Sequence, residues 1–277
     1  MADEAPIEEL IRYEVEGGVA RITINRPDAG NSLTAVMRDR LADVFDEASA
    51  TVGVRSVILS GSGAKHFCTG AGLGGPQKPG PARPENAPDR ALGDVARMIR
   101  RGWQRLVGSI LDCEKPVIAA VNGTAAGGGA NLVLACDLVL MADSARLIEV
   151  FVRRGIMPDA GGCYLLPRAV GLARSKELMF FGDDLSAADA ERIGIANRVV
   201  PAAELEALAS DWAGRLAQGP TKALTMTKWL LNRSYESSRQ TAFEEEAYAQ
   251  ELVNATADST EGMTAFMERR PTEFSGW

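Results

Sequence analysis

The sequence predicts an α/β core followed by a helical C-terminal region. Three short, largely apolar segments alternate with segments of helical spacing, a pattern typical of parallel strands covered by helices. These apolar segments are residues 55–60, 116–121 and 137–142. Beyond Gly171 only residues 197–200 resemble a strand, and most of the remaining sequence has helical spacing. We therefore divide the chain into a core, residues 1–200, and a helical region, residues 201–277.

The other elements follow from periodicity and turn residues. Residues 11–15 and 19–24 flank a Gly-Gly pair and predict a β-hairpin. Thr34 is the expected N-cap of a helix whose apolar residues recur at helical spacing. Five prolines in residues 76–88 predict a loop. The further predicted helices are residues 91–111, 211–217, 221–232, 238–254 and 260–269.

Composition excludes several classes of function. With 30 basic and 37 acidic residues the net charge is −7 and the pI is about 5.0, so nucleic acid and anionic membrane surfaces are not expected partners. The single histidine, His66, excludes a two-histidine metal site. The four cysteines form no CxxC pair, as expected of reduced thiols. No segment resembles a membrane span or a signal peptide. We expect a cytoplasmic protein without a bound metal.

Two glycine-rich turns each follow an apolar strand and lead into a helix. They are residues 61–75 and 122–129. Neither matches the phosphate-binding pattern GxxxxGK[ST] or the dinucleotide-binding pattern GxGxxG. Backbone N–H groups at such turns stabilise a negatively charged oxygen, and two adjacent turns can each supply one donor to it. Glycines also permit close packing of a helix on a strand, so both interpretations stay open.

Five blocks of the sequence carry a resemblance to the crotonase superfamily, which includes the enoyl-CoA hydratases and isomerases. FCTGAGL (67–73) resembles the family pattern FxAGADL, and AVNGTAAGGGANLVLACDLVL (120–140) resembles AVNGxAxGGGxELALxCD. The remaining blocks are NRPDAGNSL (25–33), GIMPDAGGCYLLPRAVG (155–171) and FMERRPTEF (266–274), in family order. The resemblance covers nearly the whole chain, and several independent motifs in order are a specific signal.

The resemblance implies a spiral of ββα units, helical C-terminal trimerisation and an acyl-coenzyme A thioester as substrate. A homotrimer or a hexamer built as a dimer of trimers is expected, with no cofactor apart from the coenzyme A of the substrate. The two family oxyanion donors correspond to the N–H groups of Ala71 and Gly128, for which a plain turn and helix–strand packing are the structural alternatives. Where the family carries aspartate after the alanine, this chain has Gly72.

The two glutamates of the family hydratases are both missing. The first corresponds to Asn131 and the second to Phe151, and neither an amide nor a phenyl ring exchanges a proton at neutral pH. Asn131 is expected to hydrogen-bond a substrate group or a water molecule, or to satisfy buried backbone. Glu149 lies two residues from the second position, on a predicted helix that points it elsewhere.

Asp159 is the remaining carboxylate. Family isomerases, and family members acting on aromatic-ring thioesters, often carry a single acid at this position, where it takes a proton from one carbon and returns it to another. The structural alternative is an N-cap at the start of a helix. Burial against Phe151 and Met157 would raise the Asp159 pKa and a helix N-terminus would lower it.

Further residues match positions that bind substrate in the family. Arg26 and Ala29 correspond to coenzyme A contacts, and His66, with Phe67 beside it, precedes the first oxyanion turn. Phe266 and Arg269 correspond to positions that reach the ligand of a neighbouring subunit, and a guanidinium suits a phosphate. Solvent-exposed arginines and an edge histidine are the alternatives.

Three functions remain for test. The first is a crotonase-fold isomerase that shifts a carbon–carbon double bond in an acyl-CoA, with Asp159 as proton shuttle. The second is an enoyl-CoA hydratase or a thioester hydrolase that uses water held by Asn131. The third is a non-catalytic acyl-CoA binder that keeps the oxyanion donors.

Overall fold

The computed structural model describes residues 5–72, 83–88 and 91–277. Within this part of the chain the strands are β1 (Ile11–Glu16), β2 (Val19–Ile24), β3 (Ser56–Gly61), β4 (His66–Cys68), β5 (Val117–Val121), β6 (Thr124–Ala126), β7 (Leu138–Ala142), β8 (Arg146–Ile148), β9 (Asp184–Ser186) and β10 (Arg198–Val200). The helices are α1 (Ile7–Leu10), α2 (Ala35–Ala50), α3 (Asp94–Arg101), α4 (Trp103–Leu111), α5 (Gly128–Ala135), α6 (Gly162–Phe181), α7 (Ala187–Arg192), α8 (Leu205–Ala217), α9 (Thr221–Arg233), α10 (Arg239–Asn254) and α11 (Ala257–Glu268). Three 3-10 turns are η1 (Pro27–Ala29), η2 (Val150–Arg154) and η3 (Ala202–Glu204).

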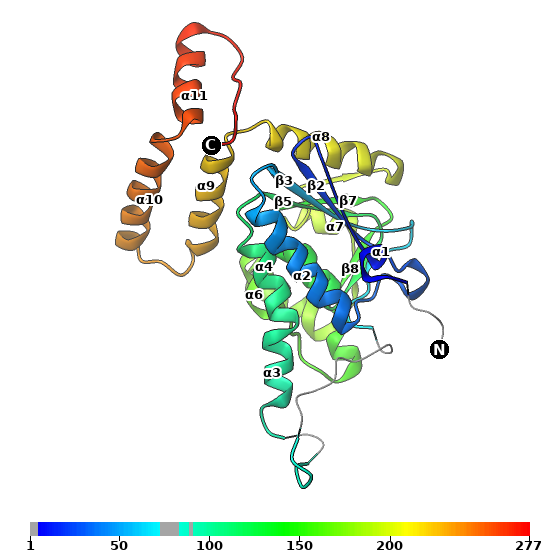
Figure 1. Ribbon diagram of the computed structural model, residues 1–277. Helices are drawn as coiled ribbons and strands as arrows, with labels where there is room; N and C mark the ends of the chain where they lie inside the picture. Colours follow the sequence, from blue (N-terminus) through cyan, green and yellow to red (C-terminus); the bar gives the residue numbers. More distant parts are fainter. Residues whose placement is uncertain (1–4, 73–82, 89–90) are drawn as a thin grey trace.

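A six-stranded sheet forms the centre of the molecule (Figure 1). Its order is β1-β2-β3-β5-β7-β10, with β1 and β2 antiparallel and every other pair parallel. All five residues of β5 are buried, because a parallel strand covered on both faces carries apolar side chains on both. α8 packs on one face, where the Ser56 hydroxyl donates to the carbonyl of Ala213 at 2.9 Å.

A second sheet of shorter strands positions the glycine-rich turns. Its order is β4-β6-β8-β9, with β4, β6 and β8 parallel and β9 antiparallel. Each of these four strands has three residues. The turns after β4 and β6 leave neighbouring strands in the same direction, so they meet at one edge of this sheet.

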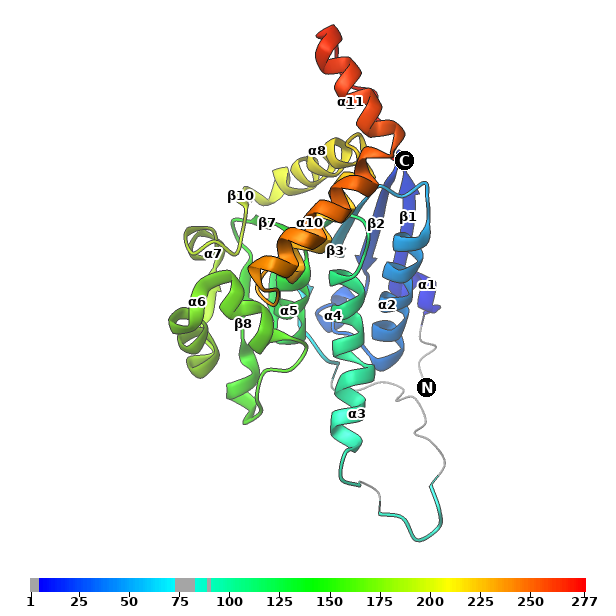
Figure 2. The ribbon, with the colours of Figure 1, turned by 90° about the vertical axis from the view of Figure 1, so that its left-hand side faces the viewer.

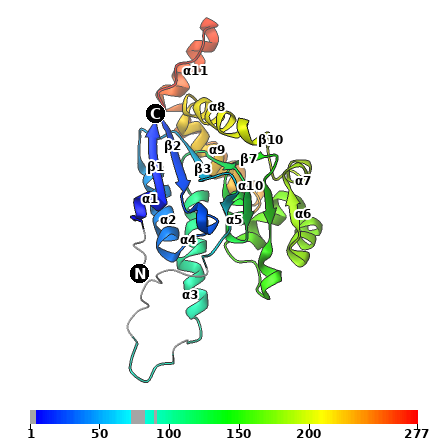
Figure 3. The same ribbon diagram turned by 90° about the vertical axis from the view of Figure 1, so that its right-hand side faces the viewer.

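Helices α2, α4, α5 and α6 form a contiguous layer beside the sheets (Figures 2 and 3). Thr34 caps α2, accepting a hydrogen bond from the N–H of Met37 at 3.3 Å. The buried side of α2 is apolar and includes Met37, Leu41 and Phe45. α4 packs against α2 and α5, and α5 packs against α6.

The last three helices, α9 to α11, form an arm beside this core (Figure 1). Buried Lys228 fastens the arm: its Nζ lies 2.8 Å from Asp137 Oδ2 and donates to the carbonyls of Ile110 and Lys115. Because α8 covers the sheet, the separate helical part begins at α9, later than residue 201.

The structure confirms the mixed α/β fold and most of the long elements, with three differences. The predicted helix 91–111 is divided into α3 and α4 at Gly102, which has non-helical φ and ψ of −108° and −99°. The strands of the second sheet were not predicted. In the C-terminal part of the chain, α8 begins at Leu205, before its predicted range.

Candidate active site

The two predicted oxyanion turns lie against each other. Gly70 has φ of +89°, and a Cβ at this residue would lie 2.9 Å from the carbonyl oxygen of Ala126 and 3.2 Å from the nitrogen of Gly128. Ala71 follows, bridged in parallel to Leu33, whose N–H donates to the Gly70 carbonyl and whose carbonyl accepts from the Gly72 N–H. Since successive N–H groups of an extended chain point to opposite sides, that of Ala71 points away from Leu33.

Gly128 is the first residue of α5, where a helix has N–H groups without a partner inside it. A Cβ at Gly128 would lie 2.5 Å from Cη2 of Trp103, and one at Gly129 would overlap the carbonyl oxygen of Cys68. Glycine is therefore required at these positions so that Trp103 and the backbone of Cys68 can approach α5 closely. The indole of Trp103 packs directly on Gly128, the second predicted donor. This contact is one that the sequence analysis missed.

Asn131 lies one turn into α5 and is completely buried. Its Nδ2 donates to the backbone carbonyl of Asp159 at 2.9 Å, which is the backbone-satisfying alternative considered for this residue. Its Oδ1 is buried and has no hydrogen-bond partner among the described residues. A Cβ at Gly162 would lie 2.7 Å from that oxygen, so the amide is held tightly between α5 and the start of α6.

Asp159 lies half-buried in the segment before α6. The N-cap of α6 is Gly161, and the Asp159 side chain does not cap the helix. Burial raises the Asp159 pKa above its ordinary value, and this outweighs the opposing effects of its own backbone N–H and of the positive charge of Arg38. A carboxylate whose proton affinity is raised in this way suits the acceptance and return of a proton near neutral pH.

Arg38, on the first turns of α2, is a cation that the sequence analysis did not single out. Its side chain is 16% exposed, and Nη2 lies 3.6 Å from Oδ1 of Asp39. The guanidinium packs on Gly102, where a Cβ would lie 2.5 Å from Cζ. Its charge lowers the pKa of Asp159. No local pattern around Arg38 indicates this, because the two residues are brought together only by the fold.

Phe151 and Met157 do not enclose Asp159 together as expected. Phe151 is buried and its ring approaches Gly127, where a Cβ would lie 3.7 Å from Cζ. Met157 is 72% exposed. Phe151 is buried, as expected, but Met157 is exposed, so the prediction that Met157 helps to bury Asp159 is wrong.

Glu149 was expected to point away from the site. It precedes η2 and does not lie within a helix, it is 5% exposed, and neither carboxyl oxygen has a hydrogen-bond partner among the described residues. Burial, and secondly the negative charge of Asp159, raise its pKa to about 7. The two carboxyl groups are therefore close enough for their charges to interact.

Three of the remaining substrate-binding candidates lie in or beside one surface groove. The groove has a volume of about 500 Å³, and Lys65 and His66 contribute to it; η1 forms part of its wall and ends at exposed Ala29. Arg26, just before η1, is half-buried with Nη1 3.4 Å from the Ser32 hydroxyl. Phe67 is completely buried in the core, so its side chain does not line the groove, and its role in substrate binding stays a prediction.

Phe266 and Arg269 are not brought to this site within one chain. Phe266 is 82% exposed on α11, and Arg269 ends that helix in a left-handed conformation with φ of +56°. Both lie on the arm, away from α5 and the start of α6 (Figure 2).

Comparison with known proteins identifies the family. The family model described as enoyl-CoA hydratase/isomerase matches residues 14–276. The chain belongs to the enoyl-CoA hydratase/isomerase family. It is 38% identical to a probable enoyl-CoA hydratase of Rhodobacter capsulatus over 96% of this chain and 98% of that protein. It is 36% identical to 1,2-epoxyphenylacetyl-CoA isomerase of Escherichia coli over 97% of this chain and 99% of that protein.

Solved structures of the family have the same fold. The crystal structure of a putative enoyl-CoA hydratase from Streptomyces coelicolor is 33% identical with a TM-score of 0.87, covering all of this chain and 98% of the other. An enoyl-CoA hydratase from Bacillus anthracis is 31% identical with a TM-score of 0.86, covering 97% of this chain and all of the other. The predicted crotonase-like α/β fold is thereby confirmed.

The described residues lack two kinds of feature. None of their helices is both long and apolar enough to cross a membrane. Residues 5–72, 83–88 and 91–277 contain no group of three or more His, Cys, Asp or Glu side chains able to hold a metal ion.

Proposed function

We propose that this protein is an enoyl-CoA isomerase that shifts a carbon–carbon double bond in an acyl-CoA thioester. The observation that carries the proposal is the half-buried Asp159 carboxyl with its raised pKa, in a site where the two hydratase acids are replaced by Asn131 and Phe151. The name of the relative from Escherichia coli, 1,2-epoxyphenylacetyl-CoA isomerase, supports the proposal.

The reaction needs one acid–base group and one oxyanion site. In a 3-enoyl-CoA, the Asp159 carboxylate takes a proton from C2, and the electron pair of that C–H bond moves onto the thioester oxygen as a dienolate. The N–H groups of Ala71 and Gly128 stabilise the oxygen as its charge develops. Protonated Asp159 then returns the proton to C4, and the double bond lies between C2 and C3. No second acid is required, because the same group acts first as base and then as acid.

We assign the coenzyme A of the substrate to the surface groove that includes Lys65 and His66. Lys65 and His66 in the groove, with Arg26 beside it, supply basic and hydrogen-bonding groups for phosphates and adenine. Phe266 and Arg269 project from α11 and suit the ligand of a neighbouring subunit, so the assembly proposed is a homotrimer or a dimer of trimers. Light scattering of the purified protein tests that assembly. No separate cofactor is proposed, and the expected location is the cytoplasm.

The test is proton exchange at C2 of a bound acyl-CoA in deuterated water, comparing the wild type with Asp159→Asn. Exchange is expected to disappear in the variant while binding of the thioester persists. Conversion of a 3-enoyl-CoA to the conjugated 2-enoyl-CoA is followed in parallel by the absorbance of the conjugated thioester. Undiminished exchange and turnover in the variant would overturn the proposal.

A hydratase is the second candidate, because most of the similar curated proteins are named hydratases. In that case Asn131 Oδ1, which is without a partner among the described residues, would hold the attacking water. Loss of enoyl absorbance from crotonyl-CoA, with formation of the 3-hydroxyacyl product, would favour the hydratase over the isomerase. Tight binding of many acyl-CoA thioesters without turnover would favour the non-catalytic binder.

A further inference from the structure

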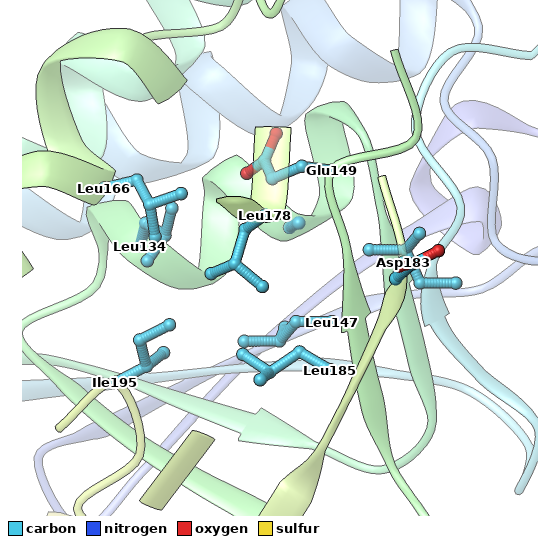
Figure 4. Close-up of a pocket in the computed structure, with 10 residues that line it drawn as sticks. Leu134, Leu147, Glu149, Leu166, Leu178, Asp183, Leu185 and Ile195 are labelled. Carbon is cyan, nitrogen blue, oxygen red and sulfur yellow. The ribbon is translucent and has the colours of Figure 1, made fainter. Parts of the chain in front are cut away.

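Glu149 is a buried acid that the proposed reaction does not use. It follows β8, and its carboxyl lies at the edge of a cavity lined largely by aliphatic side chains (Figure 4). The cavity volume is about 10 Å³. The aliphatic lining residues labelled in Figure 4 are Leu134, Leu147, Leu166, Leu178, Leu185 and Ile195. An isolated carboxylate in such surroundings is costly, so the neutral acid is the favoured form.

Asn131 belongs to the same region. Ala130 and Leu134, its neighbours on α5, line the Glu149 cavity together with Leu166 of α6. Gly162, one turn before Leu166, contacts the Asn131 amide. We call this contact region, residues 130–134 of α5 with residues 162–166 of α6, the α5–α6 seam. The Glu149 carboxyl and the Asn131 amide both lie along it.

The two groups are complementary. A neutral carboxyl has an O–H donor, and Asn131 Oδ1 is a buried acceptor without a partner in the described part of the chain. A buried polar group that is left unpaired destabilises the fold, and pairing the two groups removes this cost. No hydrogen bond joins the two groups among the described residues, so the pairing requires the Glu149 side chain to turn toward the amide. Through Nδ2 the same amide already holds the backbone of Asp159 at 2.9 Å.

We infer that Glu149 is a positioning residue for Asp159, donating its carboxyl proton to Asn131 Oδ1 and so fixing the amide that holds the Asp159 backbone. This inference rests on the proposed role of Asp159 as the proton shuttle. It assigns Glu149 no contact with substrate. It predicts that the donor is lost when Glu149 ionises, so positioning weakens as the pH rises above about 7.

Among the described residues, few other charged groups lie near Glu149, Asn131 and Asp159. Arg38 of α2 acts on Asp159 with a positive charge. Asp183, before β9, lines the Glu149 cavity, but its side chain is 83% exposed and its Oδ1 lies 3.9 Å from Arg153. From α5 and α6, the residues that line the cavity are apolar. Ionisation of Glu149 is therefore the change in this region expected near neutral pH.

The experiment compares Glu149→Gln, which keeps a donor but cannot ionise, with Glu149→Leu, which has no donor and suits the apolar cavity. The readouts are kcat and KM for C2 proton exchange between pH 6 and pH 9. The leucine variant is expected to lose kcat about 10- to 100-fold, the range that follows from a small misplacement of a reacting group, with KM unchanged. The glutamine variant is expected to keep kcat and to lose the decline above about pH 7. Asp183→Asn, an acid removed from the same cavity, is the matched control and should match the wild type.

The outcomes separate this inference from the proposed function. The positioning role would be overturned if the leucine variant kept the kcat and the pH profile of the wild type, or if both Glu149 variants lost kcat equally. Either result would leave Asp159 as the base. Full exchange in Asp159→Asn would instead overturn the proposed function. Infrared spectroscopy adds a readout that needs no turnover: the carbonyl band of protonated Glu149, absent from Glu149→Gln, should titrate near pH 7 in the wild type and at lower pH in Asp159→Asn. An unchanged midpoint in that variant would show that the two carboxyl groups do not interact and would count against the inference.

Discussion

Replacing Glu149 with glutamine changes how folding stability depends on pH, and the structure gives both the sign and the size. In the folded chain the Glu149 pKa is raised from 4.5 to about 7, first by burial and then by the charge of Asp159. The folded state therefore holds this proton more tightly than the unfolded state. Its contribution is fully present below pH 4.5 and is lost as the pH rises toward 7. Glutamine does not titrate, so the variant lacks this loss.

The magnitude follows from the two pKa values. A difference of one pKa unit corresponds to about 1.4 kcal/mol, so the change from 4.5 to about 7 is worth about 3 kcal/mol between pH 4.5 and pH 8. Because the side chain is 5% exposed, solvent screening reduces this value little. Glu149→Gln should thus gain about 3 kcal/mol of stability relative to the wild type as the pH rises across that range.

The assay is urea unfolding of both proteins at intervals from pH 4.5 to pH 8.5. One protein concentration is used throughout, because subunit association adds concentration-dependent stability. At each pH the unfolding free energy of the wild type is subtracted from that of the variant, so the contributions of titrating groups common to both proteins cancel. Asp183→Asn serves as the control, because it removes a largely exposed carboxyl from the same cavity. If the difference in unfolding free energy between Glu149→Gln and the wild type did not change with pH, the reasoning would be refuted. Glu149 would then not have the raised pKa on which the prediction depends.

Three other substitutions have defined outcomes. Arg38→Met removes the positive charge that lowers the Asp159 pKa, so the acid limb of the C2 exchange profile should move to higher pH; an unmoved limb would exclude the interaction. Lys228→Met breaks a buried ion pair and should cost about 3–5 kcal/mol in urea unfolding, whereas Lys222→Met, at an exposed pair, should cost about 1 kcal/mol or less. Gly128→Ala adds a Cβ that meets an indole at 2.5 Å and should reduce exchange about 100-fold by displacing an oxyanion donor, with circular dichroism unchanged; wild-type exchange would mean that this N–H is not a donor.

The long elements were predictable because each has a strong local signal. Thr34 supplies a capping hydroxyl before an apolar helical stripe, and β5 is apolar at every position. The strands β4, β6 and β8 have three residues each, too few to show a pattern of alternating apolar and polar side chains. They can be recognised as strands only from their pairing with one another. The split at Gly102 also depends on tertiary structure, since the glycine leaves room for the Arg38 guanidinium.

The site was predictable where it depends on glycine and unpredictable where it depends on charge. Ala71 and Gly128 lie in turns whose glycines are required by backbone contacts, and those requirements are visible as glycine-rich motifs. Arg38 and Glu149 come from α2 and from the end of β8; the charge of Arg38 lowers the Asp159 pKa, and the charge of Asp159 raises the Glu149 pKa. Nothing in the local sequence of either residue indicates the other, because such electrostatic contacts depend on distances that only the folded chain sets.

The replacement of glutamate by Asn131 and the presence of Asp159 are physically connected. An acid at position 131 would be acceptor-only when ionised, and it could not make the 2.9 Å donation that Nδ2 makes to the Asp159 carbonyl. It would also place a second negative charge beside a carboxyl whose pKa is already raised, raising that pKa further. An amide instead supports the Asp159 backbone without adding charge. For the proposed reaction, in which Asp159 alone moves the proton, asparagine therefore suits position 131. Glutamate at this position would leave less of the Asp159 carboxyl ionised at neutral pH, and this would slow the first proton transfer.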